Sequence, residues 1–511
     1  MTDWTAGYVA DLGYTHGYYN ELNPTRIALA LLQAGLALPR ITTACELGFG
    51  QGLSLNLHAA ASPVRWWGTD FNPSQAAFAQ ELTRIAGSEA RVFDDAFADF
   101  AQRHDLPGFD FIALHGIWSW ISDENRRVIA EFARRHLNPG GVLYISYNCF
   151  PGWAAFVPLR ELLKAHTDIL GAPGQGRVGR IDGAIGFVER LLATNPAYAR
   201  ENPAIAARFN KLKEHNRAYL AHEYFNRDWA PMSLGTMAEW LQPAKLDYAG
   251  SAHPLDAIDA IHLTEEQRTL LAEIPDPLFR AGVRNFMVNQ QFRRDYWVKG
   301  PRRLNALEQR AQIRALRLVL TTSGADVPIK VTGTLGKATL NEALYTALLE
   351  ILTDHQPRTF AQIEQALVGK KIAFAQLWET VRILAGGGHL HLAQDEAVAS
   401  ERRTHTDALN AHLMQQARGS DAIRFLASPV TGGGIHVDRF HQLFLLARQQ
   451  GRQMPADWAA FVWEQLKAQG QRVLKEGKAL ESEADNLAHL TGEAESFAAK
   501  RLAVMEALQV A

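Results

Sequence analysis

The stretch CELGFGQG, residues 45–52, places three glycines at alternate positions within one short turn. The apolar run ITTACEL, residues 41–47, predicts a buried strand before it, and LSLNLHAAA, residues 53–61, predicts a helix after it. So many glycines mean either that the backbone turns sharply or that a ligand comes very close to it. A strand, a glycine-rich turn and a helix together indicate a ligand held against backbone N–H groups at the helix N-terminus.

The same alternation of strand and helix continues along the chain. Apolar runs predict further strands at residues 64–71, 91–97, 109–120 and 142–148, and two more at 244–252 and 292–300. Residues 126–141 predict an amphipathic helix that ends at a proline and two glycines. The fold class that this pattern predicts is α/β, a doubly wound, Rossmann-like sheet of seven strands with its ligand at the carboxyl ends of the strands.

Composition and length describe an ordinary globular protein. At 511 residues the chain is long enough for several domains. The formal net charge of -2 gives no general attraction to nucleic acids or anionic membranes, and no apolar run approaches the length of a membrane span. The two cysteines exclude a disulfide scaffold and a cysteine-rich zinc site, and the N-terminus lacks the features of a signal peptide. We therefore expect a cytoplasmic protein without a metal cofactor.

The details of the glycine turn separate the candidate cofactors. The pattern E-L-G-F-G-Q-G, residues 46–52, departs from the G-x-G-x-x-G of nicotinamide and flavin sites, and the chain has no G-x-x-x-x-G-K-[ST] phosphate loop. Glu46, at the end of the strand, suits a cationic ligand. S-adenosylmethionine carries a sulfonium and an ammonium but no phosphate, so it needs carboxylates and a close backbone. Asp70, about 20 residues beyond Gly52, stands where an acid bonds ribose hydroxyls.

The chain resembles a known family at several motifs. The glycine turn, Asp70, Asp95 and LNPGG, residues 137–141, are similar to the successive motifs of class I S-adenosylmethionine-dependent methyltransferases. HGIWSWISDENRR (115–127), LYISYNCFPGW (143–153), AHEYFN (221–226) and VRNFMVNQQFRRDYW (283–297) resemble bacterial methyltransferases with a methyltransferase regulatory domain. The characterised members of that group are protein-lysine methyltransferases that modify bacterial outer-membrane proteins. The resemblance covers the N-terminal part of the chain, to near residue 300.

The resemblance implies a set of S-adenosylmethionine contacts. Three glycines would let the backbone approach the methionine part and the adenosine, an acid beneath the cofactor would face its ammonium, and a second acid would take the ribose hydroxyls. A third acid, one of two neighbours, would accept from the adenine amino group, and a strand-end histidine would lie beside the transferable methyl group. Phe49 occupies the loop position where many relatives have a small residue. The three glycines are Gly48, Gly50 and Gly52, the acid facing the ammonium is Glu46, and the acid for the ribose is Asp70. The acid for the adenine is Asp95 or Asp94, and the strand-end histidine is His115.

A lysine acceptor would make one further demand, because its amine must be neutral to attack. A mainly aromatic, poorly hydrated channel favours the neutral amine and still tolerates a sulfonium by cation–π attraction. Aromatic and polar residues lie near the expected carboxyl edge of the sheet, and we expect such a channel from Tyr18, Tyr19, Trp118, Trp120, Tyr147, Asn148 and Trp153. Any one of these aromatic residues is more typical of core packing, and only the set as a whole favours a channel. His115 fits equally well a strand-end histidine that has only a structural role.

The remaining organisation follows from local patterns. We expect an S-adenosylmethionine-binding core over residues 1–165 and a helical insertion with the regulatory segment over 166–300, including a flexible glycine-rich loop at 171–180. Residues 301–405 have the outline of a winged helix, three helices and a glycine-hinged hairpin, and 406–511 are mostly helical. Between residues 340 and 395, four basic and six acidic residues argue against nucleic-acid binding. For the expected winged helix we therefore favour a role in contacts with other proteins or in the formation of a homodimer.

The sequence therefore favours an S-adenosylmethionine-dependent methyltransferase that acts on lysine side chains of a protein substrate. Two alternatives remain. One is a small-molecule or peptide N- or O-methyltransferase on the same sheet. The other is a non-catalytic cofactor-binding regulator that acts through the winged helix.

Overall fold

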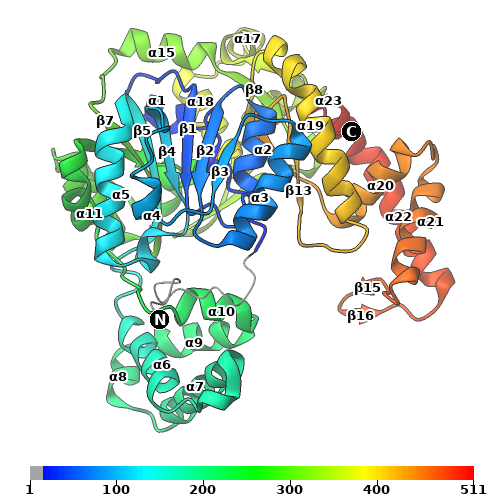
Figure 1. Ribbon diagram of the computed structural model, residues 1–511. Coiled ribbons are helices and arrows are strands. Elements are labelled where there is room, and N and C mark those ends of the chain that lie inside the picture. Colours follow the sequence, from blue (N-terminus) through cyan, green and yellow to red (C-terminus); the bar gives the residue numbers. More distant parts are fainter. Residues whose placement is uncertain (1–14) are drawn as a thin grey trace.

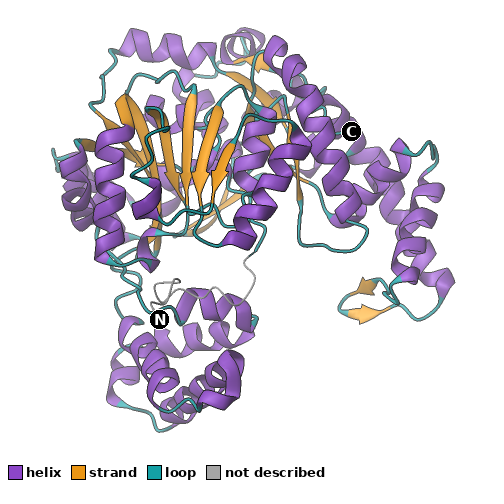
Figure 2. Cartoon of the chain, in the orientation of Figure 1, coloured by secondary structure: helices purple, strands orange, loops and turns teal. Residues whose placement is uncertain are grey.

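A seven-stranded sheet forms the centre of the molecule in the computed structural model, which describes residues 15–511 (Figure 2). The strand order is β3-β2-β1-β4-β5-β7-β6, and only β7 runs antiparallel to its neighbours. The predicted doubly wound sheet is thus confirmed. Its strands are β1 (Thr43–Leu47), β2 (Arg65–Thr69), β3 (Arg91–Phe93), β4 (Phe109–Leu114), β5 (Leu137–Asn148), β6 (Leu246–Ser251) and β7 (Phe292–Lys299).

Helices cover both faces of this sheet, which is why its central strands are apolar at nearly every position. One face packs against α1 (Ile27–Gln33), α2 (Leu53–Ala61) and α3 (Pro73–Ala86). The opposite face packs against α4 (Phe97–Phe100), α5 (Asp123–His136), α11 (Leu234–Leu241) and α14 (Pro277–Met287). The short helices α12 (Asp259–His262) and α13 (Glu265–Ala272) lead from β6 to α14.

A separate helical lobe lies beyond the carboxyl ends of the strands (Figure 1). It has its own apolar core and consists of α6 (Val157–Ile169), α7 (Gly176–Ala193), α8 (Ala197–Glu201), α9 (Ala204–Glu214) and α10 (Arg217–Tyr224). The helical insertion was predicted, but the loop expected at 171–180 is shorter, because α7 already begins at Gly176. Burial of Ile181, Ala184 and Ile185 along α7 offsets the low helix propensity of its glycines.

The region after the sheet begins with two small sheets and four helices. These elements are α15 (Ala306–Ala315), β8 (Arg317–Leu320), β9 (Lys330–Gly333), β10 (Gly336–Thr339), α16 (Glu342–Ile351), β11 (Arg358–Thr359), α17 (Phe360–Ala366), α18 (Phe374–Gly386) and β12 (Leu390–Leu392). The expected hairpin after the glycines at 386–388 does not form among the described residues. Strand β12 pairs instead with β8, far upstream in the chain. The winged helix is therefore not confirmed.

The last part of the chain packs directly on the sheet-covering helix α2. It comprises α19 (Glu396–Gln416), β13 (Phe425–Ser428), β14 (Gly433–His436), α20 (Arg439–Gln449), α21 (Pro455–Ala468), β15 (Leu474–Lys475), β16 (Lys478–Ala479), α22 (Glu483–Lys500) and α23 (Leu502–Ala507). Leu53 and Leu57 share a core with Leu409 and Leu426, and α19 lies along α2 and α3 (Figure 1). All nine residues of α2 are consequently buried. Among the described helices, none has the length and apolar character that crossing a membrane requires.

Candidate active site

A cavity of about 190 Å³ lies at the carboxyl ends of the parallel strands, on the side of the helical lobe. Loops after four strands contribute to its wall, together with the segment before α1, the turn that leads into α5, and two residues that follow α10. The lining residues are 15, 17, 19, 48–51, 70–72, 75, 95–97, 115–117, 120–122, 125, 227 and 228. The site therefore lies where a doubly wound sheet binds its ligand.

The glycine turn brings its backbone close to the wall of this cavity. Gly48 and Gly52 have φ values of +73° and +67°, which L-residues with side chains rarely adopt. A Cβ at Gly48 would lie 2.4 Å from the Ile117 side chain, and one at Gly52 would lie 2.5 Å from Ala79. Gly50 also has a positive φ, and its N–H group donates to Asp70. The turn thus needs its glycines both for conformation and for close approach.

Asp70 lies at the end of β2 with its carboxylate against the glycine turn. Its two oxygens accept hydrogen bonds from the N–H groups of Gly50, at 2.9 Å, and Asn72, at 3.0 Å. Burial raises the pKa of Asp70 to about 6, although both hydrogen bonds favour the ionised form. The carboxylate is therefore fixed in direction and mostly ionised at neutral pH, as an acceptor for ligand hydroxyls should be.

Glu46 is a buried acid beneath the glycine turn, outside the cavity lining. Burial, and then the charge of Asp70, raise its pKa to about 8. Its Oε2 atom has no hydrogen-bond partner among the described residues. An unpaired buried carboxylate oxygen is costly, and a cation or donor supplied by a ligand would satisfy it.

The two neighbouring acids after β3 differ in position. Asp95 lines the cavity, and Arg103 Nη1 donates to its Oδ2 at 3.0 Å. Asp94 is exposed and does not line the cavity. Of the two predicted candidates for the adenine amino group, the structure therefore brings only Asp95 to the site.

His115 ends β4 and lies between two tyrosines. Its ring stacks on Tyr19 with a centroid distance of 3.6 Å, and its Nδ1 shares a hydrogen bond of 2.8 Å with the hydroxyl of Tyr144. Burial lowers the pKa of His115 to about 4, although the charge of Glu21 acts in the opposite direction. The imidazole is thus neutral at physiological pH and is fixed in orientation.

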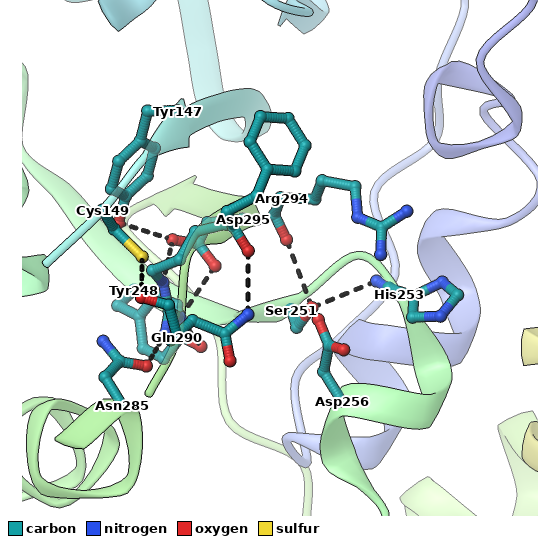
Figure 3. Close-up of polar contacts among 12 residues, drawn as sticks. Tyr147, Cys149, Tyr248, Ser251, His253, Asp256, Asn285, Gln290, Arg294 and Asp295 are labelled. Atoms are coloured by element: carbon teal, nitrogen blue, oxygen red, sulfur yellow. Dashed lines mark hydrogen bonds and ion pairs between the residues drawn. The ribbon is translucent and has the colours of Figure 1, made fainter. Parts of the chain in front are cut away.

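Three residues predicted to line the acceptor channel lie elsewhere. Trp118 and Tyr147 are fully buried in the core on the opposite face of the sheet, and Asn148 is buried as well. The Nε1–H group of Trp118 donates to Met232 Sδ at 3.3 Å, and the Tyr147 hydroxyl donates to Asp295 at 2.8 Å (Figure 3). None of the three contributes to the cavity wall.

For Tyr147, the reason for this placement is the alternation of side chains along β5. Tyr144 points to the face that carries α1 and α2, whereas Tyr147, three residues later, points to the face that carries α5 and α11. Of the other expected aromatic residues, Tyr19 and Trp120 line the cavity, whereas Tyr18 packs against β14 and Trp153 against the core of the lobe.

The cavity also contains residues that the sequence did not reveal. Arg227 and Asp228 follow α10 and bring charged side chains of the lobe to the cavity wall. The Nε1–H group of Trp120 donates to the backbone oxygen of Glu223, also from the lobe, at 3.4 Å. The sequence offered one signal for Arg227 and Asp228. They lie in NRDW, residues 226–229, which directly follows the family motif AHEYF.

Two family models match the regions that build this site. Residues 44–141 match a model described as a methyltransferase domain, and residues 216–299 match one described as a predicted methyltransferase regulatory domain. The protein is therefore an S-adenosylmethionine-dependent methyltransferase with a methyltransferase regulatory domain.

One relative extends this likeness to the whole chain. The uncharacterized protein sll1526 of Synechocystis is 39% identical over 512 residues, which cover 99% of both chains, and this chain belongs to the same family. The uncharacterized protein RP789 of Rickettsia prowazekii is 26% identical over 256 residues, 43% of each chain. The structure of PKMT2 from Rickettsia typhi in complex with AdoHcy has the same fold, with a TM-score of 0.66 and 17% identity over 95% of this chain and 98% of that one.

Proposed function

We propose that this protein transfers methyl groups to the side-chain amines of lysine residues in a protein substrate. The observation that carries the proposal is the cavity lining, which combines acidic residues and the glycine turn with apolar side chains. We assign these two kinds of residue to two parts of the site. Carboxylates and the glycine turn form one part, and a mainly apolar wall of Tyr19, Ile117 and Trp120 forms the other. The likeness over nearly the full length to PKMT2, whose name denotes a protein-lysine methyltransferase, supports a protein substrate.

The residues of the first part fit S-adenosylmethionine. Asp70 would accept the ribose hydroxyls, and Asp95 the adenine amino group. The unpartnered Oε2 of Glu46 would face the ammonium group, directly or through water, while Gly48 leaves room for the methionine part. When bound, the cofactor supplies a methyl group on a sulfonium for an in-line displacement, so alignment and exclusion of water dominate the chemistry.

The second part suits an amine that arrives as an ammonium and reacts as a neutral base. Asp228, on the cavity wall, would attract the lysine cation, in exchange for its present ion pair with Arg227 at 2.8 Å. Deeper in the cavity, the rings of Tyr19 and Trp120 would desolvate the amine and favour its neutral form. His115 is a weak base, because its pKa is about 4. We therefore assign it an orienting role beside the acceptor, with the amine losing its proton to solvent.

The direct test is to locate the transferred methyl group. The full-length protein would be incubated with isotope-labelled S-adenosylmethionine and a cell lysate, and the products analysed by mass spectrometry after proteolysis. We expect label on lysine side chains, and none with the Asp70→Ala variant. Label confined to small molecules, with no labelled peptide, would contradict the proposal and favour the small-molecule alternative.

A pH profile tests the acceptor with a matched pair of tryptophans. A free lysine has a pKa of roughly 10.4, so the rate at low substrate concentration should rise with pH until the acceptor's shifted pKa is passed. Trp120→Ala should admit water to the channel, so the pH at which the rate stops rising should move to a higher value. Trp118→Ala, in the core of the opposite face, should lower the stability of the protein and leave that pH unchanged. A flat wild-type profile, with chemistry rate-limiting, would argue against an unassisted amine acceptor.

A further inference from the structure

A second cavity, of about 160 Å³, lies where the catalytic sheet meets the C-terminal region. It shares no lining residue with the cofactor cavity. Helix α1, the end of β6, the turn Pro254–Ala257 and helix α18 enclose it, through residues Leu29, Ala30, Gln33, Ala34, Ala249, Gly250, Ser251, Pro254, Ala257 and Arg382. Arg382 is the only charged side chain among them.

Two of the three guanidinium nitrogens of Arg382 are buried without a hydrogen-bond partner among the described residues. The residue is 7% exposed, and neither its Nε nor its Nη1 atom has a hydrogen-bond partner among the described residues. Its nearest favourable contact is the ring of Trp378, whose centroid lies 5.9 Å from the guanidinium carbon. Arginine stays protonated in proteins, so Arg382 is a largely buried cation with two donor nitrogens that no described acceptor satisfies.

No described acid forms an ion pair or hydrogen bond with Arg382, although the charges of Glu379 and Asp259 favour its protonated form. Asp259 is already paired with Arg284, whose Nε lies 2.8 Å from its carboxylate. Asp256 accepts a hydrogen bond from Ser251 at 2.8 Å (Figure 3). Glu379, one turn earlier in α18, is exposed to solvent. The cavity wall therefore presents one positive charge and no negative charge.

We propose that this cavity binds a small oxyanion, such as inorganic phosphate or a carboxylate group, with Arg382 as its charged anchor. The planar guanidinium matches the oxygens of either group. Gln33 adds a neutral donor, because its Oε1 accepts from the Nε1–H group of Trp378 at 3.0 Å and its amide nitrogen remains available. A bound anion would bridge α1 of the catalytic sheet and α18 of the C-terminal region.

The test uses inorganic phosphate and acetate as probes of the full-length protein. Thermal unfolding and calorimetry would compare each anion with chloride at equal ionic strength. We expect phosphate, acetate or both to raise the unfolding temperature beyond chloride, and the better probe identifies the class of anion. Arg382→Gln should weaken binding of that anion at least about tenfold, since a hydrogen bond to a charged group is lost. Arg382→Lys should retain part of the response.

Arg403→Gln on α19 is the matched control, because it removes the same charge from an exposed site. It should respond to the anion as the wild type does. Without added anion, Arg382→Gln should be at least as stable as the wild type, since it removes an unpaired buried cation. Equal stabilisation of wild type and Arg382→Gln by the anion, or none beyond chloride for either, would overturn the proposal. Affinity for S-adenosylhomocysteine, measured in parallel, is expected to be the same in both proteins.

Discussion

Two groups of aromatic and titratable residues lie at the carboxyl ends of β4 and β5, on opposite faces of the sheet. On one face, Tyr19, His115 and Tyr144 adjoin the cofactor cavity. On the other, Trp118 and Tyr147 are sealed beneath α5, α11 and the regulatory segment. The members that come from β4 and β5 lie in the last residues of these strands or just after them, and they look alike in the sequence. The face to which each side chain points therefore decides between a role at the ligand and a role in the core.

The two faces differ most clearly in how their acids are satisfied. Asp295 receives two hydrogen bonds from Arg293 and one from Tyr147, each at 2.8 Å. Arg293 donates in addition to Asn285 and Tyr248, which completes a closed network (Figure 3). On the cavity side, Glu46 retains an oxygen without a partner. A closed network stabilises a fold, whereas an incomplete one is suited to a ligand.

The largest effect is expected from breaking the closed network. Asp295→Ala removes the partner of the buried Arg293 and leaves its charge uncompensated. We expect a loss of about 3–5 kcal/mol of stability, measured as a lower midpoint of urea or thermal unfolding. Below that midpoint, calorimetry should find an unchanged affinity for S-adenosylhomocysteine. A variant as stable as the wild type would mean that the network contributes little to the fold.

The second effect should appear on the cavity side, in ligand affinity instead of stability. Asp70→Ala removes the proposed acceptor of two ribose hydroxyls, which should cost roughly 2–4 kcal/mol of cofactor binding. Asp94→Ala is the matched control, because Asp94 is exposed and outside the cavity. Calorimetry with S-adenosylhomocysteine measures both variants. Equal affinities in the two would remove Asp70 from the proposed site.

Sequence patterns were sufficient to predict the sheet, because the features that define it lie within short segments of the chain. Central strands buried on both faces are apolar throughout, and the glycines of the first turn have conformations that side chains disfavour. Asp70 and Asp95 could be placed near the expected ligand because each comes within two residues after a strand whose carboxyl end faces the cavity.

Sequence patterns failed where distant segments meet. Tyr147 and Trp118 were wrongly expected in the acceptor channel. Their position near the end of a strand does not show whether they point to the face of the sheet that adjoins the cavity. Asp228 was missed because only the folding of the lobe over the sheet brings it to the cavity. The expected hairpin after α18 did not form, because β8 offers β12 a partner that lies some 70 residues away in the chain. The burial of α2 by the C-terminal region is likewise a purely tertiary effect.

A third effect, on the pH dependence of stability, should reveal the contribution of Glu46. Glu46 has a pKa of about 8 in the folded protein against an ordinary value of 4.5. Between these values the folded state holds a proton that the unfolded chain has lost. Stability of the cofactor-free protein should therefore fall as pH rises through this window. Glu46→Gln should remove the part of this loss of stability that is due to Glu46. Unfolding midpoints measured at several pH values would show the difference.

The same substitution should change the protons released on binding. An ammonium beside Glu46 favours its ionised form, so cofactor binding near neutral pH should release up to about one proton. Calorimetry of S-adenosylhomocysteine in two buffers of different ionisation enthalpy measures this release. Glu46→Gln should release fewer protons and bind roughly 1.5–3 kcal/mol more weakly. Identical proton release in wild type and variant would show that Glu46 does not contact the ammonium.

The smallest effect, and the sharpest comparison of the two faces, comes from removing one hydroxyl on each. Tyr144→Phe loses the bond that orients His115, and Tyr147→Phe loses one of the three bonds to Asp295. Each substitution should cost only about 0.5–1.5 kcal/mol, but in different measurements. Tyr144→Phe should lower kcat several-fold with little change in KM for the cofactor, because a less constrained imidazole orients the acceptor less well. Tyr147→Phe should lower the unfolding midpoint and leave kcat unchanged. A lower kcat for Tyr147→Phe at full stability would show that the buried face also acts on the methyl acceptor, and the contrast between the two faces would then fail.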